Sequence, residues 1–172
     1  MSTLSHEHLD AHHTIPKRDT LVLITRVVLG GLFIFAGVMK LQDPQAFAFA
    51  IKAFKLFGTS AGDTLIPFLA YATPWIEIAA GLALILGVWG RAAAVLVGAM
   101  LVAFIAAVIS VIAQGIETKC TCFGKFEWPC VGAVGYCQVV RNLVLLALAL
   151  PTMWWGAGRW AFTRDAATKL RS

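Results

Sequence analysis

The stretch LVLITRVVLGGLFIFAGVMKL, residues 21–41, decides the fold of this chain. Crossing the hydrocarbon core of a bilayer takes about 20 residues of helix, and this stretch is long enough. Asp43 and Pro44 follow and end it. Three more apolar blocks of similar length lie at about 64–88, 92–114 and 133–155. The sequence therefore predicts an all-α integral membrane protein, a bundle of four transmembrane helices.

The overall composition agrees with this class. Of the 172 residues, 59% are hydrophobic and 13% are charged, about half the usual charged share of roughly 25%. The net charge is +5, but the Lys and Arg residues stand at the ends of apolar blocks. No basic stripe alternates with aromatic residues. The lipid bilayer is therefore the expected partner, and nucleic acid is not.

Polar segments flank the membrane domain, which is predicted over residues 20–156. Residues 1–19 contain all four histidines and are interpreted as a disordered cytoplasmic tail, in preference to a metal-binding tract. Residues 157–172 form a basic cytoplasmic tail. Residues 44–58, PQAFAFAIKAFKLFG, are too short and too amphipathic to cross, so we expect a short interfacial helix between the first two spans. No haem or metal is expected, because the histidines, His6, His8, His12 and His13, lie outside the membrane domain.

The distribution of basic residues predicts the orientation. Four crossings place both termini on one side, and that side carries seven Lys and Arg residues against five on the other. The positive-inside rule then favours cytoplasmic termini in the inner (plasma) membrane. The loop that holds three of the four cysteines would face the periplasm, where disulfides persist. The two sets are Lys17, Arg18, Arg91, Arg159, Arg164, Lys169 and Arg171, against Lys40, Lys52, Lys55, Lys119 and Lys125.

Three ionisable residues fall within the predicted spans, where such groups are functional candidates. Arg26 lies about 9 Å from a helix end, by helical rise, and its long side chain can reach water. Glu77 lies near the midplane, after Pro74, and is expected to be protonated, paired with Arg141 or Arg26, or exposed to a wet cavity. A structural ion pair and a role in quinone or proton handling both stay open.

The four cysteines are the other candidate site. Cys120 and Cys122 form C-T-C-F-G, which is too tight for a relaxed disulfide and is typical of a reducible, redox-active pair. A structural disulfide with Cys130 and a metal site remain alternatives, although the usual C-x2-C pairs of zinc sites are absent. Cys137 is interpreted as a packed helix thiol rather than a further redox residue.

Four runs of the sequence resemble a known family. The runs RVVLGGLFIFAGVMKLQDPQAF, PWIEIAAGLALILG, CTCFG and RNL resemble the DoxX/MauE family of small four-helix membrane proteins, over roughly residues 20–155. CTCFG and RNL point to the MauE-like branch. The resemblance implies work with a thioredoxin-like protein during maturation of methylamine dehydrogenase, and the broader group is linked to quinone-coupled sulfur oxidation. The positions that match its motifs are Arg26, Lys40, Glu77, Cys120, Cys122, Arg141 and Asn142.

The leading hypothesis is a redox-associated membrane protein, a component of a thiol–disulfide/quinone oxidoreductase. Cys120 and Cys122 would exchange disulfides with a periplasmic thioredoxin-like partner, and the bundle would pass electrons to a quinone through Glu77 and Arg141. Cys130 and Cys137 are additional redox candidates. The alternative is a non-catalytic subunit that anchors a larger membrane complex of the respiratory type.

Overall fold

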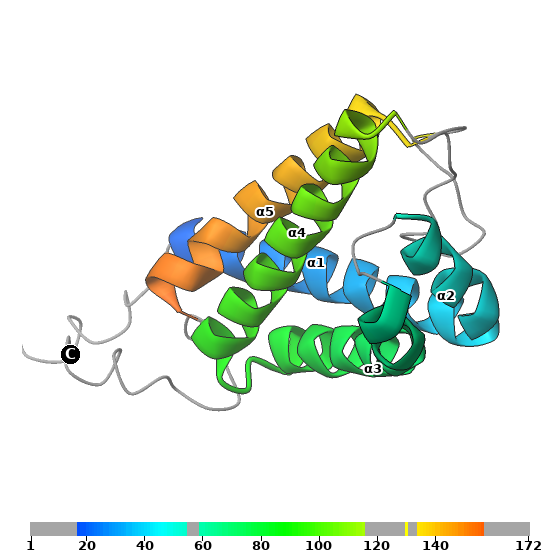
Figure 1. Ribbon diagram of the computed structural model, residues 1–172. Helices are drawn as coiled ribbons and strands as arrows, with labels where there is room; N and C mark the ends of the chain where they lie inside the picture. The colour runs from blue at the N-terminus through cyan, green and yellow to red at the C-terminus, as the bar shows by residue number, and fades with distance from the viewer. Residues whose placement is uncertain (1–16, 55–58, 116–129, 131–133, 157–172) are drawn as a thin grey trace, which may run out of the picture.

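The structure, a computed structural model, describes residues 17–54, 59–115, 130 and 134–156 (Figure 1). Every regular element in these residues is a helix. Four of the helices have the length and apolar composition to cross a membrane, which confirms the predicted helical membrane bundle. The five helices are α1 (Lys17–Gln42), α2 (Pro44–Ala53), α3 (Thr59–Leu86), α4 (Gly90–Ala113) and α5 (Tyr136–Trp155).

Each long helix packs against two of the other long helices. α1 packs on α3 and α5, and α4 packs on α3 and α5. The closest pairs are α1 with α3 and α4 with α5, and Figure 1 shows these two pairs crossing each other. The buried core at the crossing is apolar, with Leu29, Leu84, Val97 and Leu101 among its members. Outside the core, large apolar side chains such as Val27, Leu82, Val102 and Val144 are exposed, as lipid-facing residues are.

α2 begins at a capped end directly after α1. Asp43 accepts a hydrogen bond from the Ala46 backbone N–H at 3.0 Å, and Pro44 occupies the first turn, where its missing N–H is not needed. The helix packs its Phe47 and Ala50 side against α3 and α1. A short amphipathic helix at this place was predicted from the sequence.

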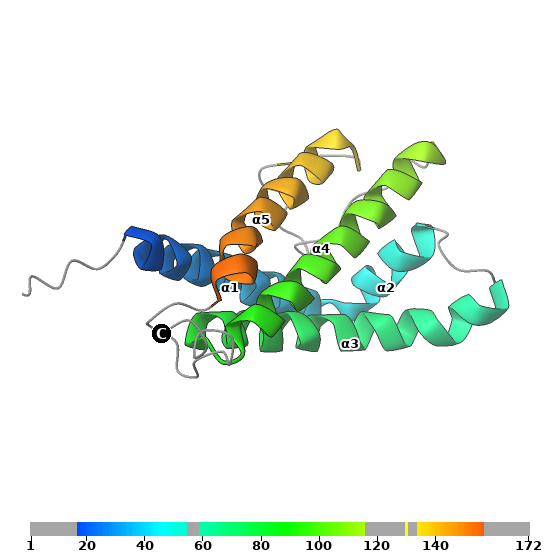
Figure 2. The ribbon, with the colours of Figure 1, turned by 90° about the vertical axis from the view of Figure 1, so that its left-hand side faces the viewer.

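α3 and α4 form an antiparallel hairpin. The connection is residues 87–89, where Gly87 has a φ of 71° and Trp89 a φ of 47°. Glycine adopts this left-handed conformation at no steric cost, which is the reason for its use in so short a turn. From the turn the two helices diverge, and α2 lies toward the open side between them (Figure 2).

Three helices begin three or more residues away from the sequence-based prediction, and one of them is α1, which starts at Lys17 rather than at residue 21. α3 begins at Thr59, five residues before the predicted span, and continues through both Pro67 and Pro74. α5 begins at Tyr136 rather than near 133. Gly135, just before α5, donates its backbone N–H to the Gln138 side chain at 2.8 Å, and this contact fixes the first turn.

Candidate functional site

The centre of the bundle holds an ion pair. Lys40, in the last turn of α1, donates to Glu77 Oε1 on α3, and both side chains are only 1% exposed. Paired opposite charges are the form in which a low-dielectric interior tolerates ionised groups. The prediction that Glu77 pairs with Arg141 or Arg26 is therefore wrong. So is the placement of Lys40 among the charges of the outer side.

The helix register explains this pairing. α1 and α3 are antiparallel, and their backbones come so close that a Cβ on Gly30 would lie 2.7 Å from the Gly81 carbonyl oxygen, and one on Gly37 2.8 Å from that of Pro74. Helical side chains tilt toward the N-terminus of their own helix. Lys40 therefore leans inward along α1 while Glu77 leans along α3 toward it, and the two meet.

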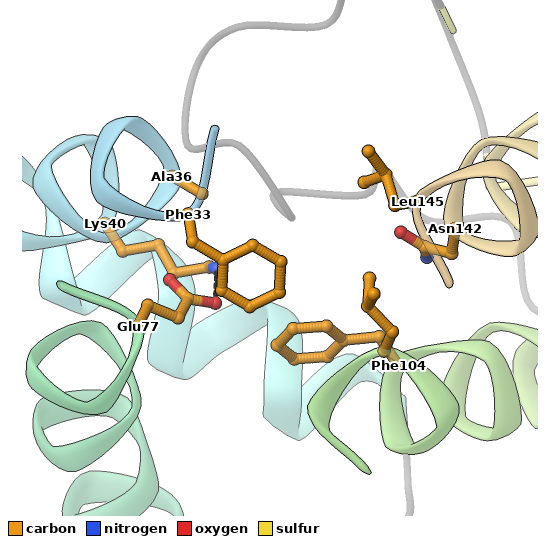
Figure 3. Close-up of a pocket in the computed structure, with 8 residues that line it drawn as sticks. Phe33, Ala36, Lys40, Glu77, Phe104, Asn142 and Leu145 are labelled. Carbon is orange, nitrogen blue, oxygen red and sulfur yellow. Dashed lines mark hydrogen bonds and ion pairs between the residues drawn. The ribbon is translucent and has the colours of Figure 1, made fainter. Parts of the chain in front are cut away.

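A small cavity of about 20 Å³ lies beside the pair. Figure 3 shows Lys40, Glu77 and Phe33 on one side, with Phe104, Asn142 and Leu145 facing them from α4 and α5. Within the described part of the chain, Glu77 Oε2 and Asn142 Nδ2 are buried without a hydrogen-bond partner. Both residues belong to the wall of the small cavity, Glu77 from α3 and Asn142 from α5.

The Lys40 ammonium also contacts aromatic rings. It lies 5.2 Å from the ring centroid of Phe47 on α2 and 5.2 Å from that of Phe104 on α4. Both distances are within the range of a cation–π interaction. The residue therefore joins α1, α2, α3 and α4 at one point.

A second, larger hollow opens between α2, α3 and α4. Its volume is about 360 Å³, and Lys40 and Phe104 line it as well as the small cavity. Among the described residues that line it, all but Lys40 and Thr73 are apolar. The other lining residues are Phe47, Ala50, Ile51, Phe54, Leu69, Ile76, Leu96, Met100, Ala103 and Ala107.

Arg26 has a structural position at the other end of α1. Its side chain is 0% exposed, with Nε donating to the Leu84 carbonyl at 2.8 Å and Nη2 to the Ile85 carbonyl at 3.1 Å. These are carbonyls of the last turn of α3, where the regular intrahelical hydrogen bonds end, and the Leu84 carbonyl also accepts the Gly87 backbone N–H at 3.2 Å. The side chain does not reach out to water as predicted, because it caps α3.

Arg141 and Asn142 are neighbours on α5 with different surroundings. Asn142 is 3% exposed and lines the small cavity. Arg141 is partly buried and is not among the residues that line this cavity. The structure thus brings Lys40 rather than Arg141 into contact with Glu77, and the role expected for Arg141 stays a prediction.

The cysteines are described only in part. Cys130 and Cys137 form a disulfide, with 5.8 Å between their Cα atoms, which ties the end of the loop to the first turn of α5. The interpretation of Cys137 as a packed thiol is wrong, because its side chain lies exposed at the helix start, within reach of Cys130. Cys120 and Cys122 lie outside the described residues.

Several site residues were not singled out from the sequence. Phe33, Phe104, Leu101 and Leu145 line the small cavity, but they resemble any other apolar residue of a span. Lys40 was named as a motif position of the family, but its burial was not predicted, although the sequence contains a signal for it. Lys40 continues the buried stripe of α1 at helical spacing, after Val22, Arg26, Leu29, Phe33 and Ala36.

Comparison with known proteins places the chain in a family. The family model described as methylamine utilisation protein MauE matches residues 18–155. The methylamine utilization protein MauE of Paracoccus denitrificans is 32% identical over 127 residues, which are 73% of this chain and 64% of that protein. The match thus spans less than two thirds of the relative's length. No solved structure matches. With its four long apolar helices and a family match over nearly the whole bundle, the chain belongs to the MauE family.

Proposed function

We propose that this chain is a membrane component of methylamine utilisation that exchanges disulfides with a thioredoxin-like partner on the outer side of the inner membrane. The observation that carries the proposal is the Cys130–Cys137 disulfide at the start of α5, in a loop that also contains C-T-C-F-G. Disulfides persist in oxidising compartments. The family name supports the pathway.

The exchange would begin at Cys120 and Cys122. A thiolate of the partner attacks the disulfide of this pair, a mixed disulfide forms, and the second partner thiol resolves it. The partner leaves oxidised, and the chain keeps two thiols. Lys119 and Lys125 flank the pair in the sequence and favour its thiolate forms.

A quinone in the bilayer is the proposed acceptor of these two electrons and two protons. Reoxidation of the dithiol to a disulfide would reduce the quinone to a hydroquinone, so that atoms and electrons balance. Glu77 supports this step because it is a buried carboxylate in the wall of a cavity, and its Oε2 has no hydrogen-bond partner among the described residues, so that a proton can be held there. Relation to the wider DoxX group, from which the quinone link comes, stays a prediction.

Thiol trapping in membranes tests the exchange. Cells that produce the wild type, Cys120→Ser/Cys122→Ser or Cys130→Ser/Cys137→Ser are treated with a mass-tagged maleimide, with and without added quinone. We expect the wild type to cycle and the first variant to lose both cycling and growth on methylamine. The second variant is the matched control, with the same number of cysteines removed. Full growth of the first variant would instead favour a non-catalytic anchor of a larger complex.

A further inference from the structure

The tryptophan and tyrosine side chains that the structure describes are all exposed, but they lie at different depths in the membrane domain. Most stand at helix ends, in the α3–α4 turn or at the two ends of α5, namely Trp89, Tyr136, Trp154 and Trp155. Such ends lie at the membrane interfaces, where both residue types concentrate. Tyr71 and Trp75 instead lie inside the span Leu65–Leu86 of α3, and they are 61% and 62% exposed.

Trp75 lies at the middle of its span. At a rise of about 1.5 Å per residue it is about 15 Å from either end of Leu65–Leu86, and Tyr71 is about 9 Å from Leu65. An indole ring is too short to bring its N–H to the headgroups from that depth. Among the described residues, neither the Trp75 N–H nor the Tyr71 O–H has a hydrogen-bond partner. Lipid tails offer none, and an unsatisfied polar group in hydrocarbon is costly.

Both side chains belong to one outward face of α3. Exposed residues follow one another along it at helical spacing, and we call them the aromatic face: Phe68, Tyr71, Trp75, Ala79, Leu82 and Leu86. None of them is charged. The close contact of α3 with α1 uses another side of the helix, that of Gly81. Figure 2 shows α3 along one edge of the molecule. The aromatic face is therefore turned toward the bilayer.

We propose that the aromatic face pairs with the same face of a second copy of this chain, and that Trp75 of each copy donates its N–H to the Tyr71 hydroxyl of the other. The two copies are related by a two-fold axis along the membrane normal. Both copies then keep the same orientation in the membrane, and residues at one depth meet residues at that depth. The inference involves no cysteine and goes beyond the proposed function.

The polar groups of the face complement each other. An indole N–H only donates, whereas a tyrosine hydroxyl also accepts. Trp75 and Tyr71 are one turn apart, about 6 Å along the axis, which their rings can bridge between two adjacent helices. Within one copy the bond is not made, and across the two-fold axis it forms twice.

The rest of the face also fits a second copy. It carries no charge that would select a partner of opposite charge. Ala79 is small and exposed one turn after Trp75, so a neighbouring helix can approach closely there and the indole ring of the other copy has space. A second copy thus satisfies the Trp75 donor with a group that the face itself contains.

Cross-linking in membranes tests the pairing. Ala79 on α3 and Ala99 on α4 are both exposed, and each lies about two turns from the α3–α4 connection, so their depths are similar. Each is replaced by cysteine in a full-length chain whose Cys120 and Cys122 are serine, and the membranes are oxidised with copper phenanthroline. We expect a disulfide-linked dimer from Ala79→Cys and none from Ala99→Cys. Equal yields, no dimer from Ala79→Cys, or an adduct of that variant with a different protein would overturn the proposal.

Energy transfer between purified, labelled copies in liposomes measures the strength of association over a series of lipid dilutions. Trp75→Phe keeps an aromatic ring but removes the N–H. We expect it to weaken association about tenfold, because two interhelical hydrogen bonds are lost from each dimer. Trp89→Phe, in the α3–α4 turn, is the matched control and should leave association unchanged. Wild-type association of Trp75→Phe would refute the hydrogen bond, and absence of energy transfer in the wild type would show that lipid covers the face.

A double-mutant cycle identifies the acceptor. Tyr71→Phe removes the hydroxyl and should weaken association as much as Trp75→Phe does. The double variant should be no weaker than either single variant, because each substitution already removes both bonds. Additive losses would show that the two groups bond to different partners and would overturn the pairing. A chain that dimerises but has inert cysteines would refute only the thiol exchange, so the two failures are distinguishable.

Discussion

At the scale of single residues, the centre of this molecule is held by charges that a bilayer disfavours. Lys40 and Glu77 are fully buried and bonded to each other, and Arg26 is fully buried on the carbonyls of α3. An isolated charge in a span costs several kcal/mol, and pairing removes much of that cost. The effect of substituting one of these residues on the free energy of unfolding should therefore depend strongly on whether its partner is present.

Removing one member of the ion pair should cost far more than removing both. We expect Lys40→Met or Glu77→Leu alone to lower the free energy of unfolding by about 3 kcal/mol, because each leaves a buried charge without its partner. The double variant should lie within about 1 kcal/mol of the wild type. The free energies of unfolding of the wild type, the two single variants and the double variant, measured in mixed micelles, form a double-mutant cycle. Lys52→Met, at an exposed lysine of α2, is the control, and additive losses would show that the pair is not coupled.

Arg26 should depend on its planar shape as well as on its charge. Arg26→Lys keeps the charge but cannot reach both the Leu84 and Ile85 carbonyls in one fork, so a loss of about 1–2 kcal/mol is expected. Arg26→Met should lose more, because both bonds vanish. The same unfolding assay measures these effects. A lysine variant as stable as the wild type would mean that the fork is unimportant.

The sequence predicted that Arg26 and Glu77 lie within the spans, but neither that Arg26 and Lys40 are buried nor how the charges pair. Glu77 and Arg26 were singled out because ionisable groups are rare in spans. The partner of Glu77 depends on the register of α1 against α3. The hydrophobic periodicity of each helix in the sequence gives no information about that register. Lys40 stands near the end of its apolar block and was therefore counted with the loops. Its place on the buried stripe of α1 was the overlooked sign.

At the scale of helices, glycine sets the distance between α1 and α3. A Cβ on Gly81 would lie 2.6 Å from the Gly30 carbonyl oxygen, which is closer than real Cβ atoms come. Small residues at a helix interface allow such close approach in membranes. The contact brings α3 near enough to α1 for Lys40 to meet Glu77.

Two adjacent glycines of α1 offer a matched test of this contact. Gly30→Ala should force the helices apart and cost about 1–3 kcal/mol, as overpacking does. Gly31 has nothing within 4 Å of an added Cβ, so Gly31→Ala should be neutral or stabilising by up to about 1 kcal/mol through helix propensity. Both are measured by unfolding in micelles. Equal effects of the two substitutions would show that packing at Gly30 does not matter.

The helices themselves were largely predictable. Long apolar blocks gave four spans, and Asp43 with Pro44 gave the boundary between α1 and α2. The errors fall where hydropathy carries little information. Residues 59–63, TSAGD, are polar or small, so hydropathy does not mark them as part of a span, yet they form the first residues of α3. Hydropathy also does not show that α3 and α4 diverge and leave a groove.

At the scale of the whole molecule, the two ends of the bundle differ. The α3–α4 turn, the last turn of α5 and the start of α1 lie at one end (Figure 1), where Trp89, Trp154 and Trp155 are exposed. Tryptophan concentrates at membrane interfaces. The Cys130–Cys137 disulfide marks the start of α5, at the opposite end. One end thus carries the exposed tryptophans and basic residues such as Arg91, and the other end carries the disulfide.

This asymmetry leads to a topological prediction. Ala92 lies at the aromatic end of α4, whereas Gln42 and Gln114 lie exposed at the ends of α1 and α4 nearer the disulfide. In spheroplasts whose reactive thiols have been removed by replacing Cys120 and Cys122, a membrane-impermeant maleimide should label Gln42→Cys and Gln114→Cys but not Ala92→Cys. Permeabilised cells should label all three, which controls for accessibility. The expectation follows from the positive-inside rule and from the requirement that the disulfide face an oxidising compartment. Labelling of Ala92→Cys alone in intact spheroplasts would invert the molecule, place its cysteines in the reducing cytosol and remove the physical basis for disulfide exchange by this chain.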